Sequence, residues 1–328
     1  MTRFNRRSWI FLTTMALACS SAQAQSPTWP DRPVRVLVGF SPGGPTDIIA
    51  RIASRHLSED LKQPFVVDNR PGAAGNIATA AAAKAAPDGY TTLVASLNIT
   101  INPAMMEGIT FDSQKDIRPV RAIATAPTVL VVRPDFPARN YAEFVAELRR
   151  HPDRYNAAAQ GSSPLLAAEQ FSQLTQTRIT PVTYQGAAPA MMDLMAGNVD
   201  LSFATLGSVL PQIKSGKIRA IAVATPTRSA QLPDVPTFAE SGLQDFSFDS
   251  WAGVFVPART PEPVIAALRA SLDRLVVRPD YPGMLVDVGM TPVLDSDPAK
   301  LAAVIEKETV LYARLGKAVK ERRTIQRP

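Results

Sequence analysis

Cysteine and histidine are scarce in this sequence. The 328 residues include one cysteine, Cys19, and two histidines, His56 and His151. A single cysteine excludes an intramolecular disulfide and a cysteine-rich metal site. The histidines are not spaced as His-x-x-x-His and no Gly-x-Ser-x-Gly motif occurs, so the usual signatures of a metalloenzyme and of a serine hydrolase are missing. We therefore expect no enzyme activity, no metal and no cofactor, with a secreted hydrolase as the least favoured alternative.

Long hydrophobic runs are missing as well, although the chain is 46% hydrophobic. No apolar run reaches the ~18 residues of a membrane span. At the N-terminus, three arginines among the first seven residues precede an apolar stretch at residues 9–18, and Ala22-Gln23-Ala24 forms a small-x-small site. This pattern is typical of a secretory signal peptide, which we assign to residues 1–24.

Two other export routes remain open. Residues 5–10 partly match a twin-arginine signal, and residues 17–19 partly match a lipoprotein cleavage site that would leave Cys19 lipidated. Cleavage after Ala24 would lower the formal net charge from +6 to +3, because it removes three arginines and no acid. The remaining Lys and Arg residues are scattered, so we expect no nucleic-acid partner.

The most informative stretch joins a strand to a helix through a glycine turn. Val34–Val38 is strand-like, Pro42-Gly43-Gly44-Pro45 must turn, and Thr46 or Asp47 is placed to cap the following helix. The glycines leave the backbone uncovered where the first N–H groups of that helix lack partners. Such a loop can receive an anion. A plain tight turn remains the alternative, because the Lys-Ser/Thr of a phosphate loop is missing.

The first part of the chain predicts an α/β unit. After the glycine turn come a strand at 65–67, an alanine-rich helix at 77–86 and a strand at 90–95. This βαβαβ order implies a parallel sheet with right-handed crossovers. We expect the polar stretch 96–100 to lie at the C-terminal end of the third strand.

A second α/β series follows two extended runs, at 117–125 and 128–132, that are separated by Pro127 without a helix. A strand that leaves one sheet and enters another is expected to look like this. The expected elements are then helix 141–150, strand 155–159, helix 165–175, strand 179–182, helix 189–195, strand 199–203, a short helix after Gly207 and strand 218–224. In α/β sheets, ligands bind outside the C-terminal ends of the parallel strands. We therefore expect the three loops that follow these strands to lie together at one edge of the sheet and to face the ligand. These loops cover residues 160–164, 184–189 and 204–208.

The chain then returns to its first unit. Residues 226–250 form a Pro-, Ser- and Asp-rich connector, followed by a strand at 251–256 and helices at 263–275, 281–288 and 298–319. Two crossings between two α/β lobes predict a hinged clamshell. We therefore expect lobe 1 to comprise residues 25–125 and 250–328, and lobe 2 to comprise residues 126–249.

The order of motifs resembles the Bug family of periplasmic solute receptors, the binding components of tripartite tricarboxylate transporters. The resemblance covers essentially the whole mature chain. It rests on Phe40-x-Pro42-Gly43-Gly44-x-Thr46-Asp47, Asn69-Arg70-Pro71-Gly72-Ala73-x-Gly75-Asn76, Ala86-Pro87-Asp88-Gly89-Tyr90-Thr91, Gly161-Ser162-Ser163, Tyr184-x-Gly186-Ala187-Ala188-Pro189-Ala190 and Leu232-Pro233-Asp234-Val235-Pro236-Thr237.

The resemblance implies a two-lobed, type II-like periplasmic binding protein that closes on a small carboxylate and passes it to inner-membrane transporter subunits. It further implies a monomer and a periplasmic location. A ligand-sensing receptor for a membrane signalling partner uses the same fold and stays open as an alternative. The resemblance and the loop positions together give a ligand site comprising Phe40, Gly43, Gly44, Thr46, Asp47, Ser96, Asn98, Gly161, Ser162, Ser163, Gln185 and Thr205.

Several roles and the ligand are left open by the sequence. Asp47 is either a favourable charge at a helix N-terminus or a ligand anchor, and Ser162 and Ser163 are helix caps or ligand donors. The chain has Leu165, Gln185 and Ala204 where the family often has His, Lys and Asp. These three differences remove two positive charges and one negative charge from the side of the second lobe that would face the ligand. They favour a monocarboxylate or aromatic acid with an apolar body over a tricarboxylate or an amino acid.

Overall fold

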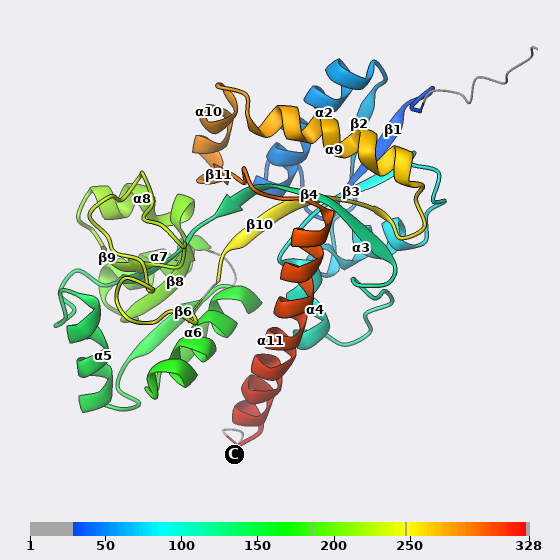
Figure 1. Cartoon of the computed structure of the whole chain (residues 1–328). Coiled ribbons are helices and arrows are strands. Elements are labelled where there is room, and N and C mark those ends of the chain that lie inside the picture. The colour runs from blue at the N-terminus through cyan, green and yellow to red at the C-terminus, as the bar shows by residue number, and fades with distance from the viewer. Residues whose placement is uncertain (1–28, 185–186, 247, 326–328) are drawn as a thin grey trace, which may run out of the picture.

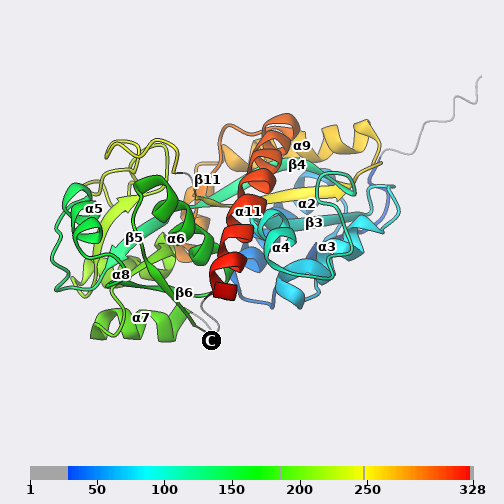
Figure 2. The ribbon, with the colours of Figure 1, turned by 90° about the horizontal axis from the view of Figure 1, so that it is seen from below.

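The computed structural model describes residues 29–184, 187–246 and 248–325, which form two lobes, each built on a β-sheet covered by helices (Figure 1). The predicted signal peptide and Gln185 lie outside the described residues. Helix α11, Pro298–Ile325, runs between the two lobes in both views (Figures 1 and 2). None of the helices in the described ranges has the length and hydrophobicity of a membrane span. The predicted two-lobed α/β fold is confirmed.

The first lobe is built on a six-stranded sheet that mixes strand directions. Its strands in spatial order are β11 (Thr291–Pro292), β4 (Ile117–Ala126), β10 (Ser250–Pro257), β3 (Thr91–Ser96), β1 (Val34–Val38) and β2 (Phe65–Asn69). β1, β2 and β3 are parallel, which confirms the predicted βαβαβ unit, whereas β10 runs antiparallel to both β3 and β4. The loops that leave β1 and β3 therefore lie at the same edge of the sheet.

Helices cover both faces of this sheet. They are α2 (Pro45–Leu61), the 3₁₀ turn η1 (Ala73–Gly75), α3 (Asn76–Ala83), α4 (Asn98–Met105), α9 (Glu262–Val276), α10 (Tyr281–Leu285), the 3₁₀ turn η2 (Val286–Val288) and α11. One apolar cluster joins the sheet to α2 and α9 through residues such as Val36, Ile49 and Leu268. The opposite face packs against α3, α4 and α11 through residues such as Leu93 and Leu315.

The second lobe is built on a five-stranded sheet. Its strands in spatial order are β7 (Thr180–Thr183), β6 (Asn156–Ala159), β8 (Leu201–Thr205), β5 (Thr128–Val132) and β9 (Arg219–Val223). β6, β7 and β8 are parallel, and β5 is antiparallel to β8 and β9. Its helices are α5 (Tyr141–Arg150), α6 (Ser162–Thr175), α7 (Ala187–Ala196) and α8 (Leu206–Lys214).

The chain crosses between the sheets at Pro127, which separates β4 in the first sheet from β5 in the second. The predicted switch of sheets is thus confirmed. The return passes through the segment before β10, and α11 packs against both α4 and α6. One apolar cluster continues across this boundary, from Leu93 of β3 to Leu166 of α6. The division into lobes at residues 126 and 249 stays our proposal, which the membership of the two sheets supports.

The helix starts differ from the sequence-based expectations. α2 has Gly44 as its N-cap and no side-chain cap, so a cap from Thr46 or Asp47 is wrong; Pro45 takes the first helical position, which suits its fixed φ. α6 is likewise preceded by Gly161 and has no side-chain cap, so Ser162 and Ser163 do not cap it.

Two other segments also differ. The polar stretch 96–100 lies at the end of β3, as expected, but α4, for which no helix was predicted, begins within it at Asn98. The helix expected at 281–288 is α10 followed by η2, and the chain leaves η2 at Gly289 with φ +63°.

Candidate ligand-binding site

The loop between β1 and α2 presents free backbone donors to open space. Gly43 has φ +84°, and a Cβ at this position would meet no atom within 4 Å. The N–H groups of Thr46 and Asp47, in the first turn of α2, have no hydrogen-bond partner in the described part of the chain, whereas Ile48 N already donates to Gly44 O at 3.0 Å. Because the N-terminus of a helix carries a partial positive charge, this arrangement suits an anion.

Asp47 holds this loop in shape. Its side chain is only 2% exposed. Oδ2 accepts hydrogen bonds from Gly43 N at 2.9 Å and Arg51 Nε at 2.8 Å, and Oδ1 accepts one from Asn69 Nδ2 at 2.8 Å. Burial alone would raise the pKa of Asp47, but the hydrogen bonds from Arg51, Gly43 and Asn69 lower it below its ordinary value. Asp47 is therefore ionised at neutral pH and braces the loop that carries the free N–H groups.

A second glycine loop packs closely against the first. A Cβ on Gly39 would lie 2.5 Å from Gly75 Cα, and a Cβ on Gly75 would lie 3.4 Å from the Phe40 ring and 2.8 Å from Asn98 Nδ2. Only glycine allows these backbones to come so near. The structure therefore brings together Phe40, the loop before α2 and Asn98, which are far apart in sequence. Asn69 and Gly75 also belong to this pair of packed loops, although the predicted site did not include them. The sequence motif from Asn69 to Asn76 could have identified both residues.

The end of β3 supplies further polar groups to the same edge. Ser96 N and Ser96 Oγ both donate to Asn98 Oδ1, each at 3.1 Å. Asn98 Nδ2 has no hydrogen-bond partner among the residues described, and both residues are half-buried. Asn98 is thereby oriented with its amide nitrogen available as a donor.

In the second lobe, the start of α6 offers a similar set of donors. Gly161 has φ +86° and is exposed, and it is followed by half-buried Ser162 and Ser163. Within the described ranges, neither serine hydroxyl has a hydrogen-bond partner, and α6 has no side-chain cap. α6 packs against α4, which begins at Asn98, so the two candidate segments belong to helices that meet at the boundary between the lobes.

Other predicted positions lie in different surroundings. Thr205 is exposed and precedes α8, where its Oγ1 donates to Ser208 Oγ at 3.1 Å. Leu165 and Ala204, where family members often carry a charge, are buried in the apolar clusters of the second lobe. Trp251 of β10, which was not among the predicted site residues, is buried, and its Nε1 donates to Glu308, so it is part of the core.

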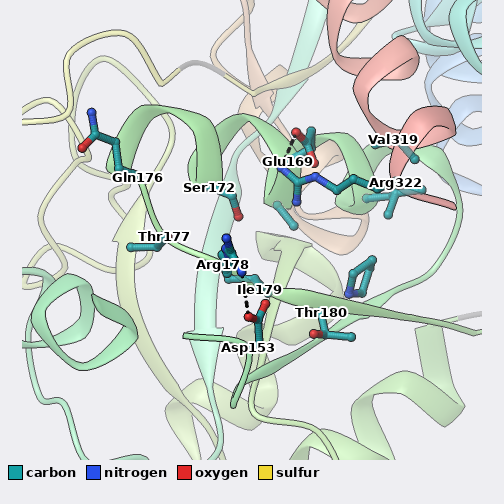
Figure 3. A pocket seen from close by; sticks show the side chains of 13 residues that line it. Asp153, Glu169, Ser172, Gln176, Thr177, Arg178, Ile179, Thr180, Val319 and Arg322 are labelled. Atoms are coloured by element: carbon teal, nitrogen blue, oxygen red, sulfur yellow. Dashed lines mark hydrogen bonds and ion pairs between the residues drawn. The ribbon is translucent and has the colours of Figure 1, made fainter. Parts of the chain in front are cut away.

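A cavity of about 640 Å³ lies between α6, β7 and the end of α11 and contains none of the predicted site residues (Figure 3). Its charged side chains are already paired: Arg322 with Glu169 at 2.9 Å and Arg178 with Asp153 at 3.1 Å. A carboxylate would find no free cation in it. We therefore place the candidate site at the loops before α2, α4 and α6.

Metal binding has no support from the described residues, which contain no cluster of three His, Cys, Asp or Glu side chains placed to hold an ion. His56 is buried, with Nε2 2.9 Å from Ser271 O. His151 is partly exposed and lies 3.6 Å from Glu147. The two histidines thus belong to different lobes, and each has a local structural partner.

Comparison with known proteins gives consistent matches over nearly the whole described chain. A family model described as tripartite tricarboxylate transporter family receptor, TctC, matches residues 49–322. BugT of Bordetella pertussis is 34% identical over 298 residues, which cover 90% of each chain. MatC from Rhodopseudomonas palustris with bound malate is 32% identical, with a TM-score of 0.70, covering 88% of this chain and 100% of MatC. A TctC solute-binding protein from Polaromonas without ligand is 26% identical, with a TM-score of 0.80, covering 88% and 99%.

Proposed function

This chain belongs to the TctC family of tripartite tricarboxylate transporter receptors, and on that premise we propose that it captures a small organic acid between its lobes by hinge closure. The observation that carries the proposal is the loop before α2, where the N–H groups of Thr46 and Asp47 are unpaired and Gly43 faces open space. A carboxylate placed there accepts these hydrogen bonds and is stabilised by the helix dipole.

The other predicted residues complete the binding of the carboxylate. Asn98 Nδ2 is a free amide donor on the first lobe, and Ser162 and Ser163 add hydroxyl donors at the start of α6 in the second lobe. The second-lobe donors reach the ligand only when the lobes approach each other. Ligand therefore favours the closed form by the free energy of these additional contacts.

The charge of the site favours a ligand with one carboxylate. Within the described part of the predicted site there is no Lys or Arg, and the adjacent Arg51 is paired with Asp47 at 2.8 Å. A second or third carboxylate would lose its hydration without gaining a cation. The ligand is thus a monocarboxylate with an apolar or aromatic body, as Gln185 in place of a lysine also favours.

The cellular setting follows from the same premise. The chain is exported, loses residues 1–24 and acts as a monomer in the periplasm, where it delivers ligand to the membrane subunits of the transporter. Its role is binding without catalysis. Mass spectrometry of the exported protein checks the export step, with a mass that begins at Gln25 as the expected result; a mass that retains a lipidated Cys19 would contradict it.

The function is tested by thermal unfolding of the refolded, ligand-free mature chain against mono-, di- and tricarboxylates, aromatic acids and amino acids. A ligand at about 100 times its dissociation constant adds about 2.7 kcal/mol, which for a chain of this size raises the Tm by roughly several degrees. We expect a rise with one or a few monocarboxylates. No rise with any carboxylate would refute the assignment of the loop before α2 as a carboxylate site.

A further inference from the structure

A separate small cavity lies within the second lobe. It has a volume of about 290 Å³ and is lined by residues that include Gln160, Ala187, Ala188, Met191, Ser208 and Gln212. Gln160 directly follows β6, Ser202 lies on β8, and the other residues lie on α7 and α8. The cavity is therefore at the C-terminal edge of the parallel strands, between the sheet and the beginnings of two helices, where α/β proteins bind ligands.

Two hydrogen-bond acceptors of this cavity are unused. Oε1 of Gln160 and Oε1 of Gln212 are buried and have no hydrogen-bond partner among the described residues. The hydroxyl of Ser208, in contrast, already donates to Thr205 O at 2.7 Å. Buried carbonyl oxygens are rarely left unpaired, because they lose the hydrogen bonds that water would give them. Each oxygen is available to accept a hydrogen bond from water in the free protein, and from a donor on a ligand that displaces this water.

The rest of the lining favours an uncharged group over a charged one. No Lys or Arg lines the cavity, and Ala187, Ala188, Ala190 and Met191 give it an apolar wall. A carboxylate there would lose its hydration without gaining a cation, which is unfavourable. A hydroxyl or another neutral donor would satisfy the oxygens and fit the apolar wall.

We propose that this cavity receives the uncharged, donor-bearing end of the ligand, so that the preferred substrate class is a monocarboxylic acid with a hydroxyl group remote from its carboxylate. This inference rests on the proposed function, which places the carboxylate itself at the loop before α2. Gln160 and Gln212 then act as specificity residues on the second lobe.

Calorimetric titration of the mature chain with two matched series of acids tests the inference. One series is hexanoate, 6-hydroxyhexanoate and adipate, and the other is benzoate, 4-hydroxybenzoate and terephthalate. One of the two series should match the size of the site and bind. In that series, the hydroxy acid should bind about tenfold more tightly than the unsubstituted acid, and the dicarboxylate should bind more weakly than the unsubstituted acid. Tighter binding of the unsubstituted acid or of the dicarboxylate overturns the inference but leaves the receptor function intact. No binding by any of the six acids, or by the wider carboxylate panel, overturns both.

Two variants locate the effect. Gln160→Leu and Gln212→Leu each remove one acceptor, and each should reduce the advantage of the hydroxyl to less than about twofold. Gln114→Leu, at an exposed position in the first lobe, is the control and should keep the full advantage. The measured quantity is the ratio of the affinities of one variant for the hydroxy acid and for the unsubstituted acid. Partial unfolding of a variant lowers both affinities equally, so the ratio is still valid. A hydroxyl advantage that survives in both Gln160→Leu and Gln212→Leu overturns the inference.

Discussion

Asn69 joins two parts of the first glycine loop: its Nδ2 donates to Asp47 Oδ1 at 2.8 Å and to the carbonyl oxygen of Phe40 at 3.0 Å. Both hydrogens of the amide are used by the loop. The carboxylate of Asp47 in turn accepts from Gly43 N at 2.9 Å. The conformation that exposes the N–H groups of α2 therefore depends on a side chain from the end of β2.

Replacing Asp47 tests this dependence. Asp47→Ala leaves Gly43 N and Asn69 Nδ2 without their acceptor, so we expect the free energy of unfolding to fall by about 1–3 kcal/mol. We also expect carboxylate affinity to fall about tenfold or more, because the loop loses its fixed shape. Urea unfolding and calorimetry measure the two effects. Asp68→Ala is the matched control, since Asp68 is partly exposed and bonds only to Arg70 among the described residues; equal losses in both variants would contradict the role of Asp47.

Much of the fold could be predicted from the sequence, because strand and helix periodicity is local information. The parallel β1–β3 unit and the switch of sheets at Pro127 are examples. α4 was missed because its sequence has β-branched residues and Pro103 inside the helix, which oppose helix formation locally. Packing against α11 and the hydrogen bond from Asn102 Nδ2 to Ala74 O outweigh that preference.

The candidate site was less predictable for a related reason. The part played by Asp47 depends on Asn69, and the nearness of Gly39 to Gly75 depends on how two loops pack. Both relationships join residues that are far apart in the chain, so no single stretch of sequence could predict them. The unpaired oxygens of Gln160 and Gln212 become visible only when β6 and α8 are brought together in space.

Two partly buried acids, Asp249 and Glu308, predict how stability depends on pH. Glu308 accepts hydrogen bonds from Trp251 Nε1 at 3.0 Å and from Thr100 Oγ1 at 3.0 Å, and burial together with the charge of Asp249 raises the pKa of Glu308 to about 7. Burial raises the pKa of Asp249 to about 7 as well, against a hydrogen bond from the backbone of Thr128. Between the ordinary carboxyl range and about pH 7 the folded protein binds more protons than the unfolded chain, so these groups make stability fall as pH rises through that window.

Neutral variants should remove this pH dependence. Glu308→Gln and Asp249→Asn should each be more stable relative to the wild type at about pH 8 than at about pH 5. Urea unfolding at the two pH values measures the difference. Glu306→Gln, an exposed neighbour on α11, serves as the control. If Glu308→Gln and Asp249→Asn keep the pH dependence of the wild type, these two acids are not its cause.

Gly207 and Gly289 form a close backbone contact between the lobes. A Cβ on Gly207, in α8, would lie 2.9 Å from Gly289 N and 3.0 Å from Val288 O, just after η2. We expect Gly207→Ala to lower the free energy of unfolding by about 1–3 kcal/mol and to increase the radius of gyration of the ligand-free protein, because the added methyl group pushes α8 and η2 apart. Gly283→Ala is the control, since a Cβ at Gly283 meets no atom within 4 Å. An unchanged radius of gyration in Gly207→Ala would show that the contact does not limit how closely the lobes approach.

Hinge closure on a carboxylate is tested most directly by small-angle X-ray scattering of the mature chain, with and without the acid that stabilises it most. Donors from the loop before α2 in one lobe and from Ser162 and Ser163 in the other should bind one ligand only when the lobes approach. The expected result is a smaller radius of gyration in the ligand-saturated protein. Identical scattering of the free and saturated protein, with binding shown by calorimetry on the same samples, would contradict closure.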